Sequence, residues 1–138
     1  MTQLFLGIGS AIFLILGAFH GILALRDVFT PRTFTPVDDS VQEAMIGVPI
    51  ALHPKTDLWK AWLGFNLSHS LGLVVFGGAL LSVAMFNPET YTSSAEVQFA
   101  AIAISAIYFI LSIKFWFIAP VVGSGIATVC FIVAAVGV

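Results

Sequence analysis

The stretch LWKAWLGFNLSHSLGLVVFGGALLSVAMF, residues 58–86, decides the fold. It contains no charged residue after Lys60 and exceeds the about 20 apolar residues that a helix needs to cross a bilayer. Because lipid offers no partner for backbone N–H and C=O groups, the pattern predicts a transmembrane helix. Its first half nevertheless holds Asn66, His69 and Ser70, which are costly in lipid. We therefore expect these polar side chains to face protein.

The composition of the whole chain indicates the same class of protein. Of its 138 residues, 59% are hydrophobic and 9% are charged, and the mean hydropathy is +1.08. A soluble domain carries about 25% charged residues, so this chain is predicted to be an integral membrane protein. The net charge of −2 argues against nucleic-acid binding. A single cysteine, Cys130, excludes an internal disulfide and a dithiol redox centre.

Four apolar runs are long enough to span a bilayer, and they predict an all-α, four-helix transmembrane bundle in one domain, residues 1–138. The runs are residues 4–25, 58–86, 95–117 and 120–138. Ser93 followed by Glu96 predicts a capping box that opens the third helix. Pro120 suits the first turn of the fourth helix, so the last two helices are expected to form a tight antiparallel hairpin.

The long link, residues 26–57, is less apolar and contains several prolines. Thr35 followed by Pro36 predicts an N-cap and a first helical residue. Apolar residues then recur at helical spacing, which predicts a short amphipathic helix over residues 36–46. We expect this helix to lie on the membrane surface or over the mouth of the bundle as a lid.

The basic residues predict the orientation of the bundle. With four spans, all of them fall on the side that holds the link and the turn between the last two helices. The positive-inside rule places that side in the cytoplasm and both termini outside. The residues concerned are Arg26, Arg32, Lys55, Lys60 and Lys114.

Polar residues occur at similar depth in all four predicted helices, and in each helix they share one face. In the second helix, Trp62, Asn66 and His69 recur at steps of four and three. Because polar groups in a membrane normally turn inward, the pattern predicts a polar pocket that opens toward the cytoplasm. The candidate ligand-binding residues are His20, Trp62, Asn66, Ser70, Ser105, Ser112, Ser124 and Thr128.

Three residues are candidates for proton transfer. His69 can act as a base because a neutral imidazole carries one donor and one acceptor, and Tyr108 or Glu43 is its candidate partner. The structural alternative for His69 and Tyr108 is a hydrogen bond that joins helices, and for Glu43 it is a solvated helix face.

The histidines do not predict a metal site or a cofactor. The three histidines lack HxxxH and HxxE spacing, so no metal site is expected. His20 and His69 differ in depth by about 6 Å, which disfavours a bis-histidine haem, although haem or chlorophyll binding stays an alternative.

Two motifs suggest a relationship to other proteins. WLGFNLSHSLG (residues 62–72) and KFWFIAPVV (residues 114–122) resemble a small family of bacterial four-helix integral membrane proteins, from which no activity carries over. The resemblance implies that the protein lies in a bacterial inner membrane. The chain also looks broadly like other four-helix membrane enzymes, including sterol isomerases and quinone reductases, but a shared fold does not imply a shared function.

Taken together, these features predict a protein that binds a small amphiphilic ligand, such as a lipid, quinone or isoprenoid, in a cytoplasm-facing polar pocket. Proton-transfer chemistry of the isomerase kind is a possible activity. The alternative is an accessory or structural subunit of a larger membrane complex. The expected partners are membrane lipid, the ligand, and a partner membrane protein or a second copy of the chain.

Overall fold

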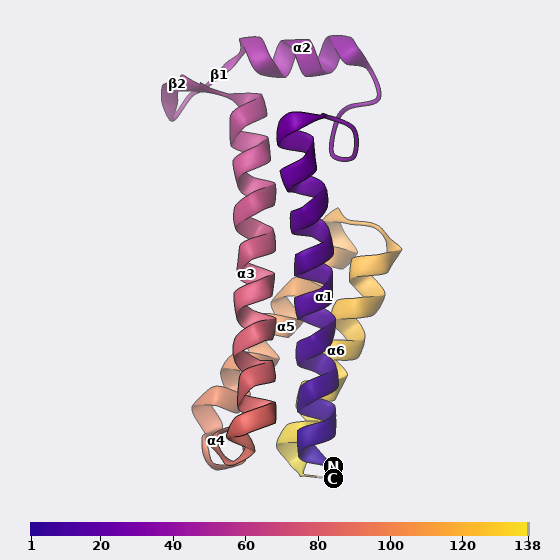
Figure 1. The fold of residues 1–138 in the computed structure, drawn as a ribbon, viewed down its shortest axis with the longest axis vertical. Helices are drawn as coiled ribbons and strands as arrows, with labels where there is room; N and C mark the ends of the chain where they lie inside the picture. Colours follow the sequence, from indigo (N-terminus) through magenta and orange to yellow (C-terminus); the bar gives the residue numbers. More distant parts are fainter. Residues whose placement is uncertain (138) are drawn as a thin grey trace. The chain divides into compact units, whose positions relative to one another are not determined.

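The computed structural model describes residues 1–137 and confirms the all-α class. Four helices are long and apolar enough to cross a membrane: α1 (Thr2–Phe29), α3 (Leu58–Phe86), α5 (Ala95–Phe115) and α6 (Ile118–Val136) (Figure 1). The predicted second span has the bounds of α3, and the other three agree with their helices to within four residues. These four helices indicate an integral membrane protein.

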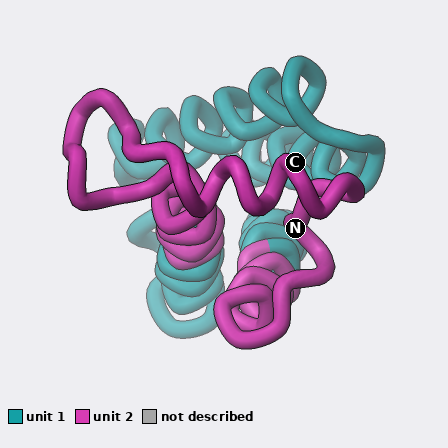
Figure 2. The backbone as a smooth tube through the Cα atoms, turned by 90° about the horizontal axis from the view of Figure 1, so that it is seen from above, with its two compact units in different colours: residues 1–16, 73–138 teal, residues 17–72 magenta. Residues whose placement is uncertain are grey.

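The chain divides into two compact units, shown in Figure 2. Unit 1 comprises Met1–Leu16 and Leu73–Val138, and unit 2 comprises Gly17–Gly72. The helices α1 and α3 each contribute one segment to unit 1 and one to unit 2. Unit 2 contains all of the link.

Aromatic rings form the centre of unit 1. The Phe13 ring lies in edge contact with Phe76, with ring centroids 5.0 Å apart, and stacks on Phe131 at 6.2 Å. Phe13 and Phe131 are almost completely buried. The backbones of α1 and α3 also approach each other closely at Gly77. A Cβ built on Gly77 would lie 2.7 Å from the Ser10 carbonyl oxygen. Only a glycine permits α3 to approach α1 this closely.

The connection from α3 to α5 contains a short helix that the sequence did not predict. This helix, α4 (Pro88–Ser93), has proline in its first turn, and its buried Tyr91 donates a hydrogen bond of 2.8 Å to the Phe131 carbonyl. Burial raises the pKa of Tyr91 to about 12. The prediction that Ser93 caps α5 is wrong, because Ser93 ends α4 and donates its hydroxyl to the Glu89 carbonyl.

The helix α5 is capped one residue later, by Ser94. The Ser94 hydroxyl accepts a hydrogen bond from the Val97 backbone N–H and donates one to the Glu96 carboxylate. Pro120 lies in the first turn of α6, as predicted, and α5 and α6 pack on each other within unit 1. A Cβ built on Gly125 in α6 would lie 2.9 Å from the Phe109 ring in α5, so glycine at this position allows the two helices to pack closely.

The link in unit 2 forms the helix α2 (Asp39–Gly47) and an antiparallel pair of strands, β1 (Pro49–Ile50) and β2 (His53–Asp57). The predicted cap at Thr35 and helix start at Pro36 are wrong. The backbone before Pro36 is held by other hydrogen bonds, and α2 begins only after Asp38, whose carboxylate accepts the Ser40 N–H. The Ser40 hydroxyl also donates to this carboxylate, and that bond together with the one from the Ser40 N–H lowers the pKa of Asp38.

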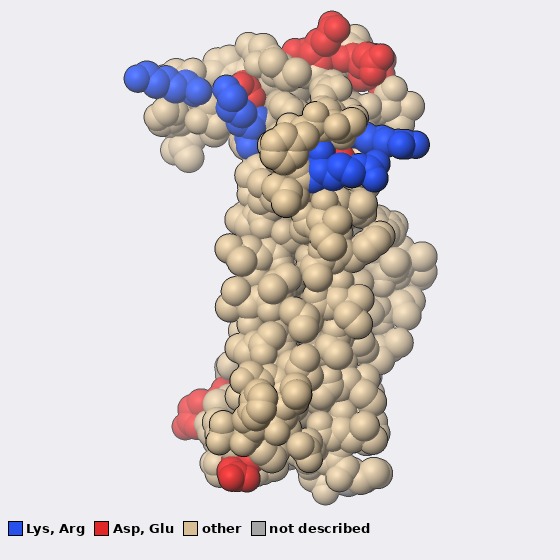
Figure 3. Space-filling view, viewed as in Figure 1, with Lys and Arg blue, Asp and Glu red and all other residues tan. Residues whose placement is uncertain are grey.

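Within unit 2, α2 runs crosswise at the end where α3 begins (Figure 1). On the face drawn in Figure 3, Lys and Arg side chains gather around the link. The helical segments 17–25 and 61–72 of unit 2 contain no charged residue. The charge pattern of unit 2 is thus that of a membrane-embedded segment with a polar cap.

Candidate functional site

The site begins with a hydrogen bond between α1 and α3 in unit 2. His20 Nε2 lies 3.1 Å from Asn66 Oδ1, and Asn66 is fully buried. The Asn66 Nδ2 donates to the Trp62 carbonyl at 2.8 Å, which leaves its Oδ1 as the atom that faces His20. Because Oδ1 can only accept, His20 Nε2 must carry the proton. A helix carbonyl therefore determines the tautomer of His20 when the ring is neutral.

A second imidazole lies against the first. The ring centroids of His20 and His69 are 5.4 Å apart, and their planes meet at 70°. His69 is also nearly parallel to the ring of Phe65, with centroids 5.8 Å apart. Both histidines are half-buried. The two rings are therefore in contact although their positions along the helices differ in predicted depth by about 6 Å.

Small side chains complete this polar cluster, which we define as His20, Asn66, His69 and Ser70. Ser70 is buried and donates its hydroxyl to the Leu67 carbonyl. A Cβ built on Gly21 would lie 3.1 Å from the Ser70 hydroxyl oxygen, so glycine at this position allows the serine to approach α1.

The link covers one side of the cluster through contacts that the sequence pattern did not predict. Asp27 is fully buried at the end of α1, and its carboxylate accepts the Thr33 N–H at 2.9 Å and the Phe34 N–H at 2.6 Å. The Trp62 Nε1–H donates to the Phe34 carbonyl at 2.8 Å. These bonds hold the Phe34 ring 4.6 Å from the His20 ring.

A sequence signal for Asp27 did exist. A carboxylate in the last turn of a helix opposes the helix dipole, so it needs partners of its own. Here those partners are the backbone N–H groups of the link. Asp27 therefore acts as a positioning residue for Phe34.

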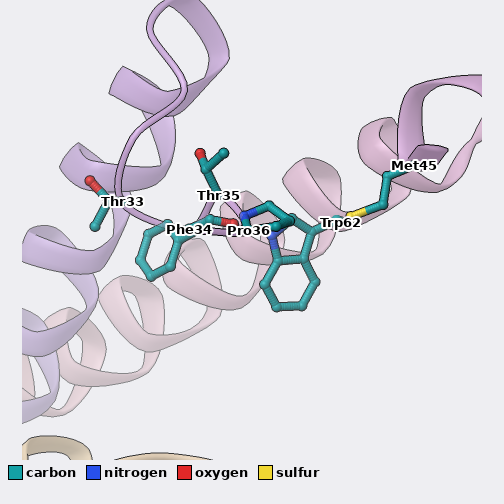
Figure 4. A pocket seen from close by; sticks show the side chains of 6 residues that line it. All are labelled: Thr33, Phe34, Thr35, Pro36, Met45 and Trp62. Atoms are coloured by element: carbon teal, nitrogen blue, oxygen red, sulfur yellow. Dashed lines mark hydrogen bonds between the residues drawn. The ribbon is translucent and has the colours of Figure 1, made fainter. Parts of the chain in front are cut away.

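An open pocket of about 410 Å³ lies beside Phe34 and Trp62 (Figure 4). Phe34 lines the pocket and also contacts His20, so it separates the pocket from the polar cluster. Trp62 contributes to the wall from α3 and Met45 from α2. The complete lining is Thr33, Phe34, Thr35, Pro36, Met45 and Trp62.

The other predicted site residues lie elsewhere. Glu43 is exposed on α2 of unit 2. Tyr108 belongs to unit 1, where its ring contacts Phe13 at 5.6 Å. The remaining four, all in unit 1, are Ser105, Ser112, Ser124 and Thr128.

The hydroxyls of unit 1 bond to their own helices. Ser105 donates to the Ile102 carbonyl, Ser124 to the Pro120 carbonyl and Thr128 to the Ser124 carbonyl. Ser112 is buried. Such bonds satisfy a hydroxyl in lipid without any ligand.

The chemistry available in the polar cluster is that of hydrogen-bonding groups. Among residues 1–137, no group of three or more His, Cys, Asp or Glu side chains has metal-binding geometry. The rings of His20 and His69 touch edge to face, so a macrocycle would have to part them. The cluster can orient a polar head group or exchange a proton between imidazole and ligand.

No protein family, curated protein or solved structure matches this chain. The resemblance described for residues 62–72 and 114–122 therefore rests on those two motifs.

Proposed function

We propose that this membrane protein binds a small amphiphilic ligand, such as a lipid, quinone or isoprenoid, through the polar cluster of unit 2. The observation that supports the proposal best is the hydrogen bond between His20 and Asn66, with the His69 ring in contact. One pair of polar side chains is enough to join two helices. Three polar side chains and a buried serine exceed that need, and intramembrane ionisable groups are functional by default.

The exposure of the cluster supports a ligand rather than a purely structural role. Asn66 is fully buried, whereas both imidazoles are only half-buried. The exposed apolar side chains of Phe65 and Leu71 lie on the same helix as His69. A head group held by the histidines would therefore leave its tail along an apolar surface.

If the protein acts on its ligand, we propose proton transfer of the isomerase kind with His69 as the base. His20 is the nearest acid–base neighbour because their rings are in contact. Tyr108, in unit 1, and Glu43, exposed on α2, remain candidates for the partner role. We further propose that the protein lies in a bacterial inner membrane. The distribution of basic residues favours an orientation with the link in the cytoplasm and both termini outside.

Replacement of His69 tests the proposal. We expect His69→Ala and His69→Phe to abolish binding of the amphiphile that co-purifies with the wild-type protein, measured by native mass spectrometry from mild detergent. The matched control is Ser68→Ala, since Ser68 is the exposed neighbour and bonds only to the Phe65 carbonyl of its own helix turn. Unchanged binding together with higher thermal stability of the His69 variants would refute the proposal.

A second candidate is an accessory subunit of a larger membrane complex. One observation favours it: Gly64, Ser68 and Gly72 are spaced four residues apart on α3 and are all exposed. Rows of small residues allow helices to approach closely. An accessory subunit should co-purify with another membrane protein, and Gly64→Leu should prevent isolation of that complex. The wild-type protein should then carry no ligand at His69.

A further inference from the structure

We infer that Arg26 and Arg32 form a binding site for the phosphate of an anionic phospholipid, whose acyl chain lies along the exposed face of α1. This inference goes beyond the proposed function and does not rest on it, because neither arginine belongs to the polar cluster. Arg26 lies in the last turn of α1 and Arg32 lies in the link, and both side chains are exposed. Both residues belong to unit 2.

The turn that follows α1 brings the two arginines together. The Asp27 carboxylate accepts the Thr33 N–H at 2.9 Å, so the residue after Arg26 is bonded to the residue after Arg32. The Thr30 N–H donates to the Arg26 carbonyl at 2.8 Å, which starts the turn directly at the end of the helix. Because consecutive Cα atoms are about 3.8 Å apart, both arginine side chains start close to the bond between Asp27 and Thr33. Two long side chains that start this close together can reach the same phosphate.

Neither arginine is neutralised by a carboxylate of unit 2. Among residues 1–137, the one ion pair joins Lys60 to Asp57 at 2.9 Å. The acidic residue nearest to both arginines in the sequence is Asp27, which is fully buried and accepts hydrogen bonds from backbone N–H groups of the link. The guanidinium groups of Arg26 and Arg32 are therefore available to an anion outside the protein. The planar fork of a guanidinium matches phosphate oxygens, which it can bind through two parallel hydrogen bonds.

The exposed face of α1 suits the acyl chain of such a lipid. Phe19, Ile22 and Arg26 are spaced three and four residues apart, so they share one face of the helix. The side chains of Phe19 and Ile22 are 64% and 66% exposed. At 1.5 Å per residue, Arg26 lies about 10 Å beyond Phe19 along the helix. This face is thus apolar over its length and ends in a cation, which matches an acyl chain that ends in a phosphate.

The charges of the link are ordered as an anionic leaflet requires. In Figure 3, Lys and Arg side chains gather next to the uncharged helical surface of unit 2, whereas acidic side chains gather over α2. The acidic residues of α2 and its cap are Asp38, Asp39 and Glu43, and all three are exposed. Each basic residue near an anionic membrane surface strengthens the attraction about fivefold. The link therefore holds its cations at the level of the head groups and its carboxylates away from them.

The test is native mass spectrometry of the full-length protein in mild detergent, titrated with dioleoyl phosphatidylglycerol or with dioleoyl phosphatidylcholine. The two lipids have the same acyl chains, but only phosphatidylglycerol carries a net negative charge. We expect one phosphatidylglycerol per chain to bind about 5- to 25-fold more tightly than phosphatidylcholine, since each arginine contributes about fivefold. Inorganic phosphate in excess should not displace the lipid, because it has no acyl chain. Equal binding of the two lipids, or displacement by phosphate, would overturn the inference.

Variants of the arginines test the site itself. Arg26→Gln and Arg32→Gln should each lower the affinity for phosphatidylglycerol about fivefold, and the double variant should bind the two lipids equally. Lys60→Gln is the matched control, because it removes the same charge from a side chain that is already paired with Asp57. It should keep the preference for phosphatidylglycerol.

Three outcomes with these variants would contradict the site. An equal loss of affinity in Lys60→Gln would mean that the lipid responds only to the total charge of the link. Binding of two phosphatidylglycerol molecules, of which each arginine variant loses one, would mean that the arginines do not share a phosphate. A co-purifying membrane protein that Arg26→Gln releases would assign this face of α1 to a protein partner instead of a lipid.

A variant of the polar cluster separates this site from the proposed function. Asn66→Leu removes the partner of His20 and leaves both arginines in place. We expect it to lose the amphiphile bound at the cluster and to keep the preference for phosphatidylglycerol. Arg26→Gln and Arg32→Gln should show the reverse. Loss of the preference in Asn66→Leu would contradict a separate lipid site, whereas a wild-type protein with no amphiphile at the cluster would contradict the proposed function alone.

Discussion

The two units of the molecule use different interactions to hold their helices. In unit 1, the rings of Phe13, Phe76 and Phe131 pack on one another, and α3 approaches α1 at Gly77. Two side-chain bonds to backbone carbonyls, from Gln3 to Ala84 and from Tyr91 to Phe131, also join elements of unit 1. In unit 2, a bond between two polar side chains, His20 and Asn66, joins α1 to α3, and Trp62 bonds to the link.

This difference indicates a division of labour. Lipid provides no hydrophobic driving force between helices, so close packing in unit 1 is what stabilises the bundle. The hydroxyls of Ser105 and Ser124 need no partner outside their helix. The polar bonds of unit 2 instead position Asn66, His20 and Phe34. We therefore expect substitutions in unit 1 to change stability and substitutions in unit 2 to change binding.

The largest expected effect is at Gly77. A Cβ on Gly77 would collide with backbone atoms, including the Ser10 carbonyl oxygen at 2.7 Å and the Leu14 Cα at 3.0 Å. Backbone cannot move aside cheaply, so Gly77→Ala should lower the free energy of unfolding by about 1–3 kcal/mol. The measurement is unfolding in mixed micelles.

The adjacent glycine is the matched control for that experiment. A Cβ on Gly78 would approach only the Leu14 Cδ1, at 4.0 Å. Gly78→Ala should therefore leave stability unchanged or raise it slightly, because alanine favours the helix. Equal loss in both variants would mean that close backbone approach does not hold unit 1 together.

The next effect concerns Asp27. Asp27→Asn loses the charged acceptor for the Thr33 and Phe34 N–H groups, and bonds to charged groups contribute about 1.5–3 kcal/mol. The exchange protection of those two amides should fall about ten- to a hundredfold. Global unfolding should change less. Asp39→Asn is the control, since Asp39 is exposed on α2. If the amide protection of Thr33 and Phe34 survives Asp27→Asn, other contacts hold this part of the link.

A smaller effect is expected at Tyr91. Tyr91→Phe removes one hydrogen bond, to the Phe131 carbonyl, at a cost of about 1 kcal/mol. Because the folded-state pKa of Tyr91 is about 12, above the ordinary value of 10.0, its contribution is complete below pH 10 and declines as the pH rises toward 12. Tyr91→Phe should therefore lose stability less steeply over that interval. Parallel pH profiles would contradict the role of Tyr91.

The spans were predictable because their signal is long and uniform. About 20 apolar residues per helix leave little ambiguity, and α3 has the bounds that its sequence predicts. The short elements were not predictable. β1 and β2 contain Pro49 and Pro54 and depend on pairing across a turn, which leaves no periodic signal. The cap of α2 is Asp38 and not the predicted Thr35, because hydrogen bonds to Asp27 and Trp62 hold the backbone of Thr33 and Phe34 just before Thr35.

The polar cluster was predictable in its residue types but not in its contacts. The sequence placed Asn66 and His69 on one inward face, but not the reach of the His20 ring to both of them. The loop that returns Phe34 to His20 depends on Asp27, and no local pattern encodes that return. The division into two units is equally invisible in the hydropathy of α1 and α3, which is continuous.

The most direct test of the central claim is native mass spectrometry of the wild-type protein in mild detergent, combined with a UV–visible spectrum of the same sample. We predict a colourless protein that carries a discrete amphiphile, and loss of that mass in Asn66→Leu. A protein that is empty, that carries only a partner protein, or that shows a Soret or chlorin band would contradict the account.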